Sequence, residues 1–366
     1  MNATLPHVLV MAGGTGGHVF PGLAVASALR ERGCRVSWLG SVHGIEATLV
    51  PQAGIELHTL PIEGLRGKGL VSGLLAPWRL GLSLWSALVL MLRLKPQVVV
   101  GFGGFASGPG GLMASALGRP LLVHEQNAVA GMTNRWLARV ADGVFAGFPD
   151  SFPESVGCRT IGNPVRRDIA ALPPPAQRWA GRQGPLRLLV LGGSLGARTL
   201  NEVVPAALAR LRVSERPEVR HQAGERTLDV ALESYRRAGV DAQVTPFVAD
   251  MADAYAWADL VICRAGALTV SEIAAVGLPA LFVPYPHAVD DHQTANARFL
   301  VAAGAAWSIS DAELTADRLA AVLGGLDRDA LLDRAERARA EARPDATDRL
   351  VEACMDAVPT RSRRRV

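Results

Sequence analysis

Short apolar runs alternate with longer helix-like segments along the chain from residue 7 onward. Runs such as 98–100 (VVV) and 121–123 (LLV) are apolar on both faces, which is typical of strands covered by helices on each side. Regular alternation of strands and helices predicts a parallel βαβ architecture. Strands are expected at 7–12, 35–40, 55–61, 97–103, 120–125, 143–148 and 159–162, and again at 186–192, 219–223, 242–248, 260–264, 280–284 and 306–309.

A proline-rich break divides this pattern. Pro173, Pro174 and Pro175 are consecutive, and consecutive prolines resist both helix and strand ladder, so 164–185 is expected to be a linker. At 366 residues the chain exceeds one usual core. We therefore expect an N-terminal domain at 1–163 and a second domain at 186–343, with a helix and basic tail at 344–366 that crosses back to the first. Both domains are expected to be doubly wound and Rossmann-like, with ligands at the carboxyl ends of their strands, facing across a cleft.

Composition narrows the classes of partner only slightly. The net charge of +4 and the pI near 9.2 are mildly basic, and a basic protein can favour nucleic acid, anionic lipid or phosphorylated substrates. The positive charge is spread generally over arginines, and no nucleic-acid partner is expected. The four cysteines lie far apart and form no CxxC pair, which argues against a zinc site or a disulfide framework and fits a reducing cytosol. The N-terminus has no basic region before its first apolar run and is expected to form a strand, not a signal peptide.

Residues 70–92 raise the question of a membrane. The segment is largely apolar, but Arg79 in mid-span argues against a transmembrane helix. Bulky apolar residues flanked by basic ones are typical of a helix lying in a membrane interface. The alternative is a helix packed on the sheet with its arginines in solvent. The residues expected to contact an anionic membrane are Leu74, Leu75, Trp78, Leu82 and Trp85, with Arg66, Lys68 and Arg79.

The stretch 13–22 (GGTGGHVFPG) follows the first predicted strand and precedes a helix expected at 23–32. Strand, glycine loop and helix together point backbone N–H groups and a helix dipole at an anion. The sequence is neither a strict GxGxxG nor a Walker A motif. His18 can take a proton from a hydroxyl bound beside the loop. Alternatively, it is a helix-start residue whose ring is fully hydrogen-bonded.

Two further polar stretches follow predicted strands of the first half. Residues 101–111 are rich in glycine, which suits a second phosphate cradle or a close approach between domains. Residues 124–127 (HEQN) follow the next strand. Glu125 is either a helix-start carboxylate or a group that binds sugar hydroxyls or orients the base. Asn127 can donate and accept hydrogen bonds with an acetamido sugar.

The second half repeats the arrangement. Residues 192–197 (GGSLGA) offer amide donors and the Ser194 hydroxyl to a diphosphate. Glu272 follows the strand–helix junction at 264–272 and can accept from both hydroxyls of a ribose, or serve as a capping-box carboxylate for Thr269. The polar cluster at 287–296 suits sugar hydroxyls or a solvated helix start. The single Asp-x-Asp, at 327–329, lies in a polar helical tail, so no metal site is expected.

Taken together, these motifs resemble the bacterial peptidoglycan glycosyltransferases that convert lipid I into lipid II, members of glycosyltransferase family 28 with the GT-B fold. The resemblance covers essentially the whole chain and rests on residues 13–22, 103–109, 124–127, 162–166, 192–197 and 263–272. It implies inverting, metal-independent and cofactor-free transfer of N-acetylglucosamine from UDP to the C4 hydroxyl of the muramyl sugar of undecaprenyl-diphosphoryl-N-acetylmuramyl-pentapeptide. It also implies a peripheral protein at the cytoplasmic face of the inner membrane, with cell-wall synthesis proteins as possible partners.

The same resemblance assigns the site residues. His18 is the favoured base, and Glu125 competes with it or supports it. The acceptor diphosphate is expected at Gly14, Gly103, Gly104 and Ser107. The residues expected to bind UDP-N-acetylglucosamine are Thr15, Gly16, Gly17, Asn127, Arg166, Ser194, Val248, Ala267, Leu268, Thr269, Val270, Ser271, Glu272 and Gln293.

The chain departs from the family pattern at four positions. Phe105 stands where Tyr is common, Leu195 replaces a usual Gln, Ala265 replaces a usual Ser, and His292 precedes Gln293 where a Gln-Gln pair is common. Three rival functions remain open at this point. They are another GT-B enzyme such as a glycolipid glycosyltransferase or a UDP-sugar 2-epimerase, an NAD-dependent oxidoreductase, and a non-catalytic membrane scaffold that binds nucleotide sugar.

Overall fold

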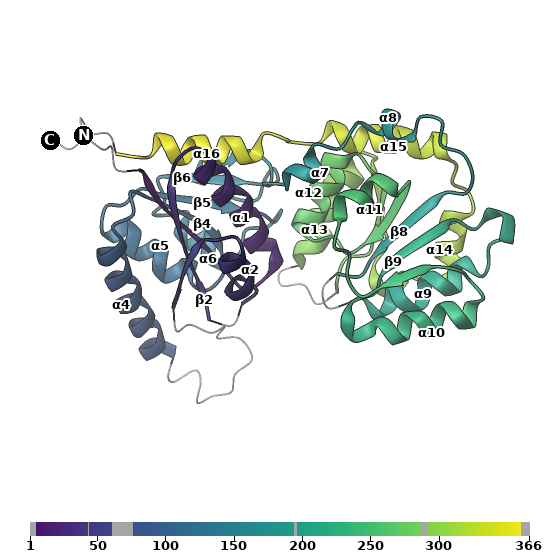
Figure 1. Cartoon of the computed structure of the whole chain (residues 1–366), viewed down its shortest axis with the longest axis horizontal. Helices are drawn as coiled ribbons and strands as arrows, with labels where there is room; N and C mark the ends of the chain where they lie inside the picture. The colour runs from purple at the N-terminus through teal and green to yellow at the C-terminus, as the bar shows by residue number, and fades with distance from the viewer. Residues whose placement is uncertain (1–4, 43, 61–75, 194–195, 287–290, 360–366) are drawn as a thin grey trace. The chain divides into compact units, whose positions relative to one another are not determined.

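The chain forms two compact units. The structure is a computed structural model that describes residues 5–42, 44–60, 76–193, 196–286 and 291–359 (Figure 1). Unit 1 spans Met1–Val165 together with Arg343–Val366, and unit 2 spans Arg166–Ala342.

Unit 1 is built on a parallel sheet with the strand order β3-β2-β1-β4-β5-β6-β7. The order reverses direction beside β1, as in doubly wound folds, where ligands bind at the carboxyl ends of the strands. The strands are β1 (His7–Ala12), β2 (Arg35–Ser41), β3 (Glu56–Leu60), β4 (Val98–Gly103), β5 (Leu121–Glu125), β6 (Gly143–Ala146) and β7 (Arg159–Thr160). The helices are α1 (Gly16–Glu31), α2 (Glu46–Gln52), α4 (Ala76–Leu94), α5 (Ser107–Ala116), α6 (Met132–Leu137) and α16 (Ala346–Asp356), with a 3-10 turn at Glu154–Val156.

Alternate residues of the central strands enter two separate cores, because successive side chains of a strand point to opposite faces. Val8 and Val10 of β1 pack with α1 and α16, whereas Leu9 and Met11 pack with α4 and α5. All four side chains are completely buried. The apolar runs of the sequence thus reflect a sheet that is covered on both faces.

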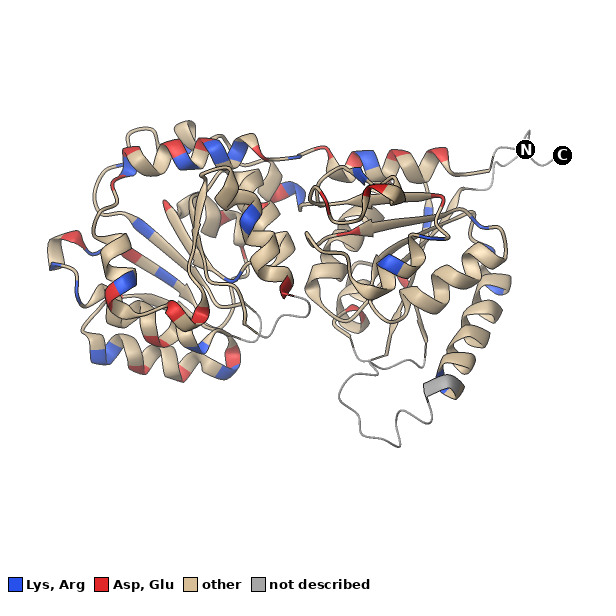
Figure 2. Ribbon diagram, turned by 180° about the vertical axis from the view of Figure 1, so that it is seen from behind, with Lys and Arg blue, Asp and Glu red and all other residues tan. Residues whose placement is uncertain are grey.

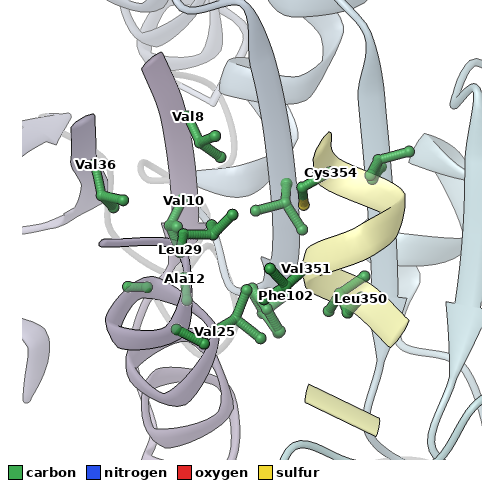
Figure 3. Close-up of a cluster of buried hydrophobic side chains, with 14 of the residues drawn as sticks. Val8, Val10, Ala12, Val25, Leu29, Val36, Phe102, Leu350, Val351 and Cys354 are labelled. Carbon is green, nitrogen blue, oxygen red and sulfur yellow. The ribbon is translucent and has the colours of Figure 1, made fainter. Parts of the chain in front are cut away.

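The last helix, α16, completes one of these cores. Leu350, Val351 and Cys354 are completely buried and lie against α1 and the sheet, close to Val25 and Phe102 (Figure 3). The helix α16 is therefore an integral part of unit 1.

Unit 2 repeats the architecture with the strand order β10-β9-β8-β11-β12-β13, again with all pairs parallel. Its strands are β8 (Arg187–Leu191), β9 (Glu218–Gln222), β10 (Gln243–Thr245), β11 (Leu260–Cys263), β12 (Ala280–Phe282) and β13 (Ala306–Ser308). Its helices are α7 (Arg167–Ala170), α8 (Pro175–Trp179), α9 (Arg198–Leu208), α10 (Leu228–Ala238), α11 (Met251–Trp257), α12 (Ala267–Val276), α13 (His292–Ala302), α14 (Ala316–Leu323) and α15 (Arg328–Ala340), with 3-10 turns at Val213–Glu215, Glu225–Thr227 and Asp311–Glu313. Two Rossmann-like parallel-sheet units confirm the predicted fold class.

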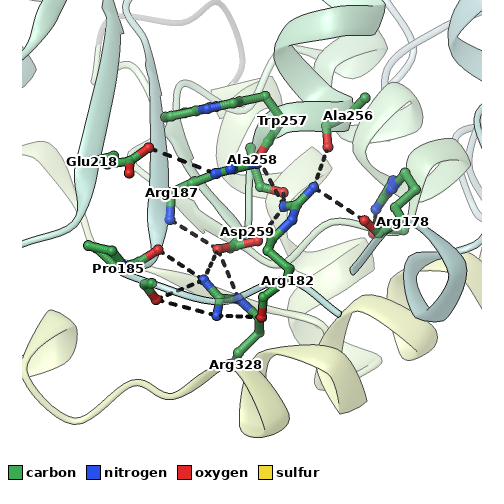
Figure 4. Close-up of polar contacts among 12 residues, drawn as sticks. Arg178, Arg182, Pro185, Arg187, Glu218, Ala256, Trp257, Ala258, Asp259 and Arg328 are labelled. Carbon is green, nitrogen blue, oxygen red and sulfur yellow. Dashed lines mark hydrogen bonds and ion pairs between the residues drawn. The ribbon is translucent and has the colours of Figure 1, made fainter. Parts of the chain in front are cut away.

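The proline-rich span differs from the linker that its prolines predict. It holds the short helices α7 and α8 and belongs to unit 2 from Arg166 onward. Pro175 occupies the first turn of α8, where the missing N–H has no intrahelical partner to lose. Further along, Arg182 donates to the completely buried carboxylate of Asp259, which also binds Arg328 (Figure 4). This ion cluster holds the segment before β8 against unit 2.

The helix α4 matches the alternative of a helix packed on the sheet, and it also has an exposed apolar face. Ala87 and Met91 are buried in the core of unit 1, so the helix packs on the sheet. On its outer face, Trp78 is 69% exposed to solvent, Trp85 64% and Leu82 46%. Few charged positions interrupt its ribbon (Figure 2). No helix within the described parts of the chain is long and apolar enough to span a bilayer. Leu74, Leu75, Arg66 and Lys68 lie outside the described residues.

Candidate active site

The first glycine stretch is shorter as a loop than its sequence predicts. The loop is limited to Gly13–Thr15, and α1 begins at Gly16, so His18 lies in the first helical turn. Tertiary packing overrides the low helix propensity of glycine here. A Cβ at Gly22 would lie 2.6 Å from the ring of Trp38, so the helix needs a glycine to approach β2. The N-terminus of α1, with Gly16 and Gly17 in its first turn, points its N–H groups beyond the carboxyl end of β1.

A buried carboxylate that the sequence analysis missed supports this loop. Glu46, which is completely buried, accepts from the Gly14 N–H at 3.0 Å and from the Ser41 N–H and hydroxyl at 2.9 and 2.6 Å. The Gly14 N–H is therefore already bonded within the protein. Gly14, whose φ is +93°, contributes an open backbone conformation to the loop rather than a free donor for the predicted diphosphate.

The second glycine stretch lies directly against the first. A Cβ at Gly104 would lie 2.5 Å from the carbonyl oxygen of Gly13, and both Gly103 and Gly104 have positive φ. The hydroxyl of Ser107 is completely buried and donates to the Gly103 carbonyl at 2.7 Å. Of the residues expected at the acceptor diphosphate, Ser107 thus uses its side chain to fix the loop, and binding of an anion at the N-terminus of α5 stays a prediction.

His18 is bonded through one ring nitrogen. Its Nδ1 lies 2.7 Å from Oε1 of Gln126, and the ring edge lies against Gly103, where an added Cβ would be 3.2 Å from Cε1. No hydrogen bond joins Nε2 of His18 to any residue that the structure describes. The ring is half-buried. The ring of His18 is therefore not the fully hydrogen-bonded ring of the helix-start alternative, and its Nε2 has no partner among the described residues.

Glu125 has all its hydrogen bonds inside the protein. Oε1 accepts from the backbone and side-chain N–H groups of Asn127 at 2.9 and 3.1 Å. Oε2 accepts from the Gly131 N–H at 3.0 Å and from Nδ2 of Asn134 at 2.8 Å. Gly131 is the N-cap residue of α6, and Glu125 is only 1% exposed. This is the helix-start carboxylate of the two alternatives, and it orients Asn127.

In unit 2 the glycine loop after β8 is braced by a side chain that the sequence analysis also missed. Gln222, at the end of β9, accepts from the Gly193 N–H and donates to the Gly193 carbonyl, both at 2.9 Å. Gly196 has a φ of +77°, and a Cβ there would collide with Thr227. Ser194 itself lies outside the described residues. The sequence alone could not indicate this contact of Gln222, because it joins the ends of two neighbouring strands and follows no fixed residue spacing.

The helix α12 begins at the carboxyl end of β11 with Gly266 as its N-cap residue. Ala267 and Val270 turn buried side chains to the core, whereas Leu268, Thr269, Ser271 and Glu272 are half-buried. Any contact of Ala267 or Val270 with a nucleotide sugar would therefore use the backbone.

The Glu272 carboxylate accepts from the Tyr255 hydroxyl at 3.0 Å, and the Arg166 Nε lies 4.0 Å away. Burial raises the pKa of Glu272 above its usual range, and Arg166 opposes this shift. The contact to Tyr255 replaces the capping-box contact to Thr269 that was the alternative interpretation.

Two other residues that were predicted to bind UDP-N-acetylglucosamine lie at the same edge of unit 2. Oε1 of Gln293 accepts from the N–H groups of Ala265 and Tyr285 at 3.1 and 2.9 Å and holds these two loops together. Val248 lines a hollow of about 250 Å³ beyond the ends of β9 and β10, whose other lining residues include Arg220, Gln222, Thr245, Phe247 and Asp250. Within the described residues no three His, Cys, Asp or Glu side chains gather closely enough to hold a metal ion.

The predicted site residues thus lie in two groups, one at the carboxyl edge of each sheet. Thr15 to His18, Gly103, Gly104 and Glu125 to Asn127 lie at the carboxyl edge of the unit 1 sheet. Arg166, Val248, Ala267 to Glu272 and Gln293 lie at the carboxyl edge of unit 2. The buried polar residues that brace these edges, Glu46, Gln126 and Gln222, were not singled out by the sequence analysis.

Comparison with known proteins identifies the family. Residues 8–146 match the model of the glycosyltransferase family 28 N-terminal domain, and residues 187–350 match that of its C-terminal domain. A protein of Chromohalobacter salexigens named UDP-N-acetylglucosamine–N-acetylmuramyl-(pentapeptide) pyrophosphoryl-undecaprenol N-acetylglucosamine transferase is 58% identical over 353 residues, which cover 96% of each chain.

Two solved structures extend the comparison. The crystal structure of Acinetobacter baumannii MurG is 43% identical, has a TM-score of 0.84 and covers 96% of this chain and 99% of its own. The UDP-GlcNAc 2-epimerase of Neisseria meningitidis is only 12% identical at a TM-score of 0.66, covering 96% and 100%, and therefore shares the fold alone. Both halves of the chain, in order and nearly complete, match one family, and the chain belongs to glycosyltransferase family 28 with the GT-B fold.

Proposed function

We propose that this protein transfers N-acetylglucosamine from UDP-N-acetylglucosamine to the C4 hydroxyl of the muramyl sugar of undecaprenyl-diphosphoryl-N-acetylmuramyl-pentapeptide, with inversion. The product is lipid II, the peptidoglycan precursor. The observation that carries the proposal is the 58% identity, over 96% of each chain, to a protein named for this transfer. The rival oxidoreductase lacks support because the chain belongs to a glycosyltransferase family.

Inversion requires one displacement at C1 of the donor sugar. The acceptor O4 forms a bond to C1 while the bond from C1 to the UDP oxygen breaks. The O4 proton passes to Nε2 of His18, the ring nitrogen that is not bonded to Gln126. Glu125 is assigned a supporting role, since both its oxygens already accept hydrogen bonds and it is 1% exposed.

The leaving group is a nucleoside diphosphate, whose charge can be stabilised without a metal ion. The N-terminus of α12 offers backbone N–H groups, and Arg166 offers a guanidinium beside Glu272. We assign Glu272 to accept from the ribose hydroxyls; burial within unit 2 raises the pKa of its carboxyl group. The hollow lined by Phe247 and Val248 has room for a uracil ring, with Phe247 68% exposed beside it.

The acceptor is a membrane lipid, and the outer face of α4 is suited to bind a membrane surface. Trp78, Trp85 and Leu82 form an exposed apolar surface with Arg79, as expected of a helix that binds an anionic membrane at the cytoplasmic face. The double variant Trp78→Ala/Trp85→Ala is expected to lose most of its binding to vesicles that contain anionic lipid. Leu232→Ala, which removes an exposed apolar side chain of unit 2, should bind normally. Equal binding by both variants would contradict this assignment.

The transfer itself is tested with labelled UDP-N-acetylglucosamine and a short-chain analogue of lipid I, with and without a chelator. We expect a labelled disaccharide lipid in both conditions. Absence of product, or product only when metal is added, would contradict the proposal. Consumption of UDP-N-acetylglucosamine without the lipid, to give its 2-epimer, would favour the epimerase instead.

A further inference from the structure

The buried side chains behind His18 form a chain of hydrogen bonds in which every proton can be placed. The chain runs from His18 through Gln126 and His124 to the Gly162 carbonyl, and all its members lie in unit 1. Gln126 and His124 are completely buried. Only the His18 end is accessible, since its ring is half-buried.

The orientation of the Gln126 amide follows from its contact with a backbone carbonyl. One end of the amide lies 2.8 Å from the carbonyl oxygen of His124, which can only accept, so this end is the NH₂ group. The other end, Oε1, then faces Nδ1 of His18 at 2.7 Å. Because Oε1 can only accept, Nδ1 of His18 must carry the proton.

The ring of His124 leads to the same orientation independently. Its Nε2 lies 2.9 Å from the Gly162 carbonyl and must donate. Burial lowers the pKa of His124 to about 4, so the ring is neutral near pH 7 and its Nδ1 has no proton. That Nδ1 lies 3.1 Å from Nε2 of Gln126 and accepts from it. Both neighbours of the amide therefore require the same end to be NH₂.

The Gln126 backbone is held as firmly as its side chain. Asn163, which is 3% exposed, donates from Nδ2 to the Gln126 carbonyl at 3.0 Å. A Cβ at Gly147 would collide with the Asn163 amide, so the packing leaves this residue little freedom to move. Rotation of Gln126 away from His18 would break its contacts to the ring and the carbonyl of His124.

We propose that Gln126 is a positioning residue that fixes the tautomer of His18, holding the proton on Nδ1 so that Nε2 presents its lone pair to the acceptor hydroxyl. The proposal rests on the proposed function, because a base is needed only if the sugar is transferred to a hydroxyl. A neutral amide can hold the proton on Nδ1 of His18 without placing a negative charge next to the ring. Free imidazole can carry the proton on either nitrogen, so loss of Gln126 would leave part of the enzyme with a protonated Nε2.

The first test reads the tautomer directly. In full-length protein with ¹⁵N-labelled histidine, long-range ¹H–¹⁵N correlation at about pH 8.5, above the ordinary histidine pKa of about 6.5, distinguishes a protonated from an unprotonated ring nitrogen. The His18 signals are identified by their loss in His18→Gln. We expect the proton on Nδ1 in the natural protein. A proton on Nε2 would overturn the proposal, whatever the activity of any variant.

The second test links the tautomer to rate. Gln126→Met keeps a similar shape and removes the acceptor, so we expect a mixture of His18 tautomers and a kcat lowered about 10- to 10²-fold, with KM for UDP-N-acetylglucosamine nearly unchanged. Gln126→Glu restores an acceptor for Nδ1, and its His18 proton should return to Nδ1. An unchanged kcat and tautomer in Gln126→Met would overturn the proposal.

A matched control removes a hydrogen bond to another buried histidine of unit 1. Ser37 lies 2.8 Å from Nε2 of His7, and Ser37→Ala should alter neither the His18 signals nor kcat. If the natural protein forms no product from the lipid I analogue, the proposed function fails. The nitrogen signals of His18 would still decide whether Gln126 sets the tautomer, so the two failures are distinguishable.

Discussion

Replacing Asp259 by Ala is expected to destabilise unit 2 by about 3–5 kcal/mol, the usual cost of removing one partner from a buried ion pair. Asp259 is completely buried, and its Oδ1 accepts from Nη1 of Arg182 at 2.5 Å. Its Oδ2 accepts from Nη2 and Nε of Arg328 at 2.9 and 3.2 Å and from the Arg187 N–H at 3.0 Å. Alanine would leave two guanidinium groups, only 10% and 18% exposed, without this carboxylate (Figure 4).

The loss should be visible in thermal unfolding. For a domain of this size each kcal/mol lowers the midpoint by about 2–4 °C, so Asp259→Ala should lower the midpoint of unit 2 by about 6–20 °C. The matched control is Asp317→Ala, which removes an ion pair with Arg210 from the surface, where Asp317 is 83% exposed. Exposed pairs contribute about 0–1 kcal/mol, so its midpoint should fall by at most about 4 °C.

Calorimetry, with circular dichroism as a second probe, measures both variants against the natural protein. A shift for Asp259→Ala no larger than that for Asp317→Ala would mean that this buried cluster does not anchor the proline-rich segment. A shift confined to unit 1, followed through its own transition, would mean the same.

Three other substitutions test separate parts of the account. Burial lowers the pKa of His221 to about 3, so below pH 6.5 the unfolded chain binds more protons than the folded chain, and the free energy of unfolding falls as the pH is lowered. In His221→Gln the free energy of unfolding by urea should fall less between pH 6.5 and 5. An unchanged slope would contradict this role of His221. Glu125→Gln turns two accepting contacts into donor–donor contacts and should lower stability by about 2 kcal/mol or more. It should reduce kcat less than His18→Ala does. Abolished turnover at unchanged stability would instead make Glu125 the base. Gly103→Ala forces a Cβ to 3.2 Å from His18 at a φ of +104° and should lower both the unfolding midpoint and kcat, whereas a variant with natural kcat would show that the His18 ring is not held there.

The strands could be predicted from the sequence because their signal is local. Runs such as 98–100 are apolar on both faces, and the sheet buries both faces. The start of α1 could not be predicted, because glycine usually weakens a helix, yet Gly16, Gly17 and Gly22 are all helical here. At Gly22 an added Cβ would lie 2.6 Å from the Trp38 ring. The prolines of 164–185 likewise predict a linker, but Pro175 fits a first helical turn.

The site could be predicted only where its residues form continuous motifs. His18 and Glu125 stand in such motifs, whereas their detailed roles depend on partners from elsewhere in the chain. Glu46 reaches Gly14 from α2, and Gln222 reaches Gly193 from a neighbouring strand. Such contacts carry no spacing pattern. The division of roles that we propose for His18 and Glu125 therefore rests on the hydrogen bonds of the folded protein.

In the proposed reaction, His18 takes the proton of the acceptor hydroxyl during transfer of N-acetylglucosamine. The most direct measurement is the rate of labelled transfer to a lipid I analogue by the natural protein and by His18→Ala, together with the Kd of each for UDP. We expect the natural protein to form lipid II and His18→Ala to lose about 10²–10⁴-fold in kcat with its Kd for UDP unchanged. Full activity in His18→Ala would contradict the account, as would a natural protein that forms no lipid II.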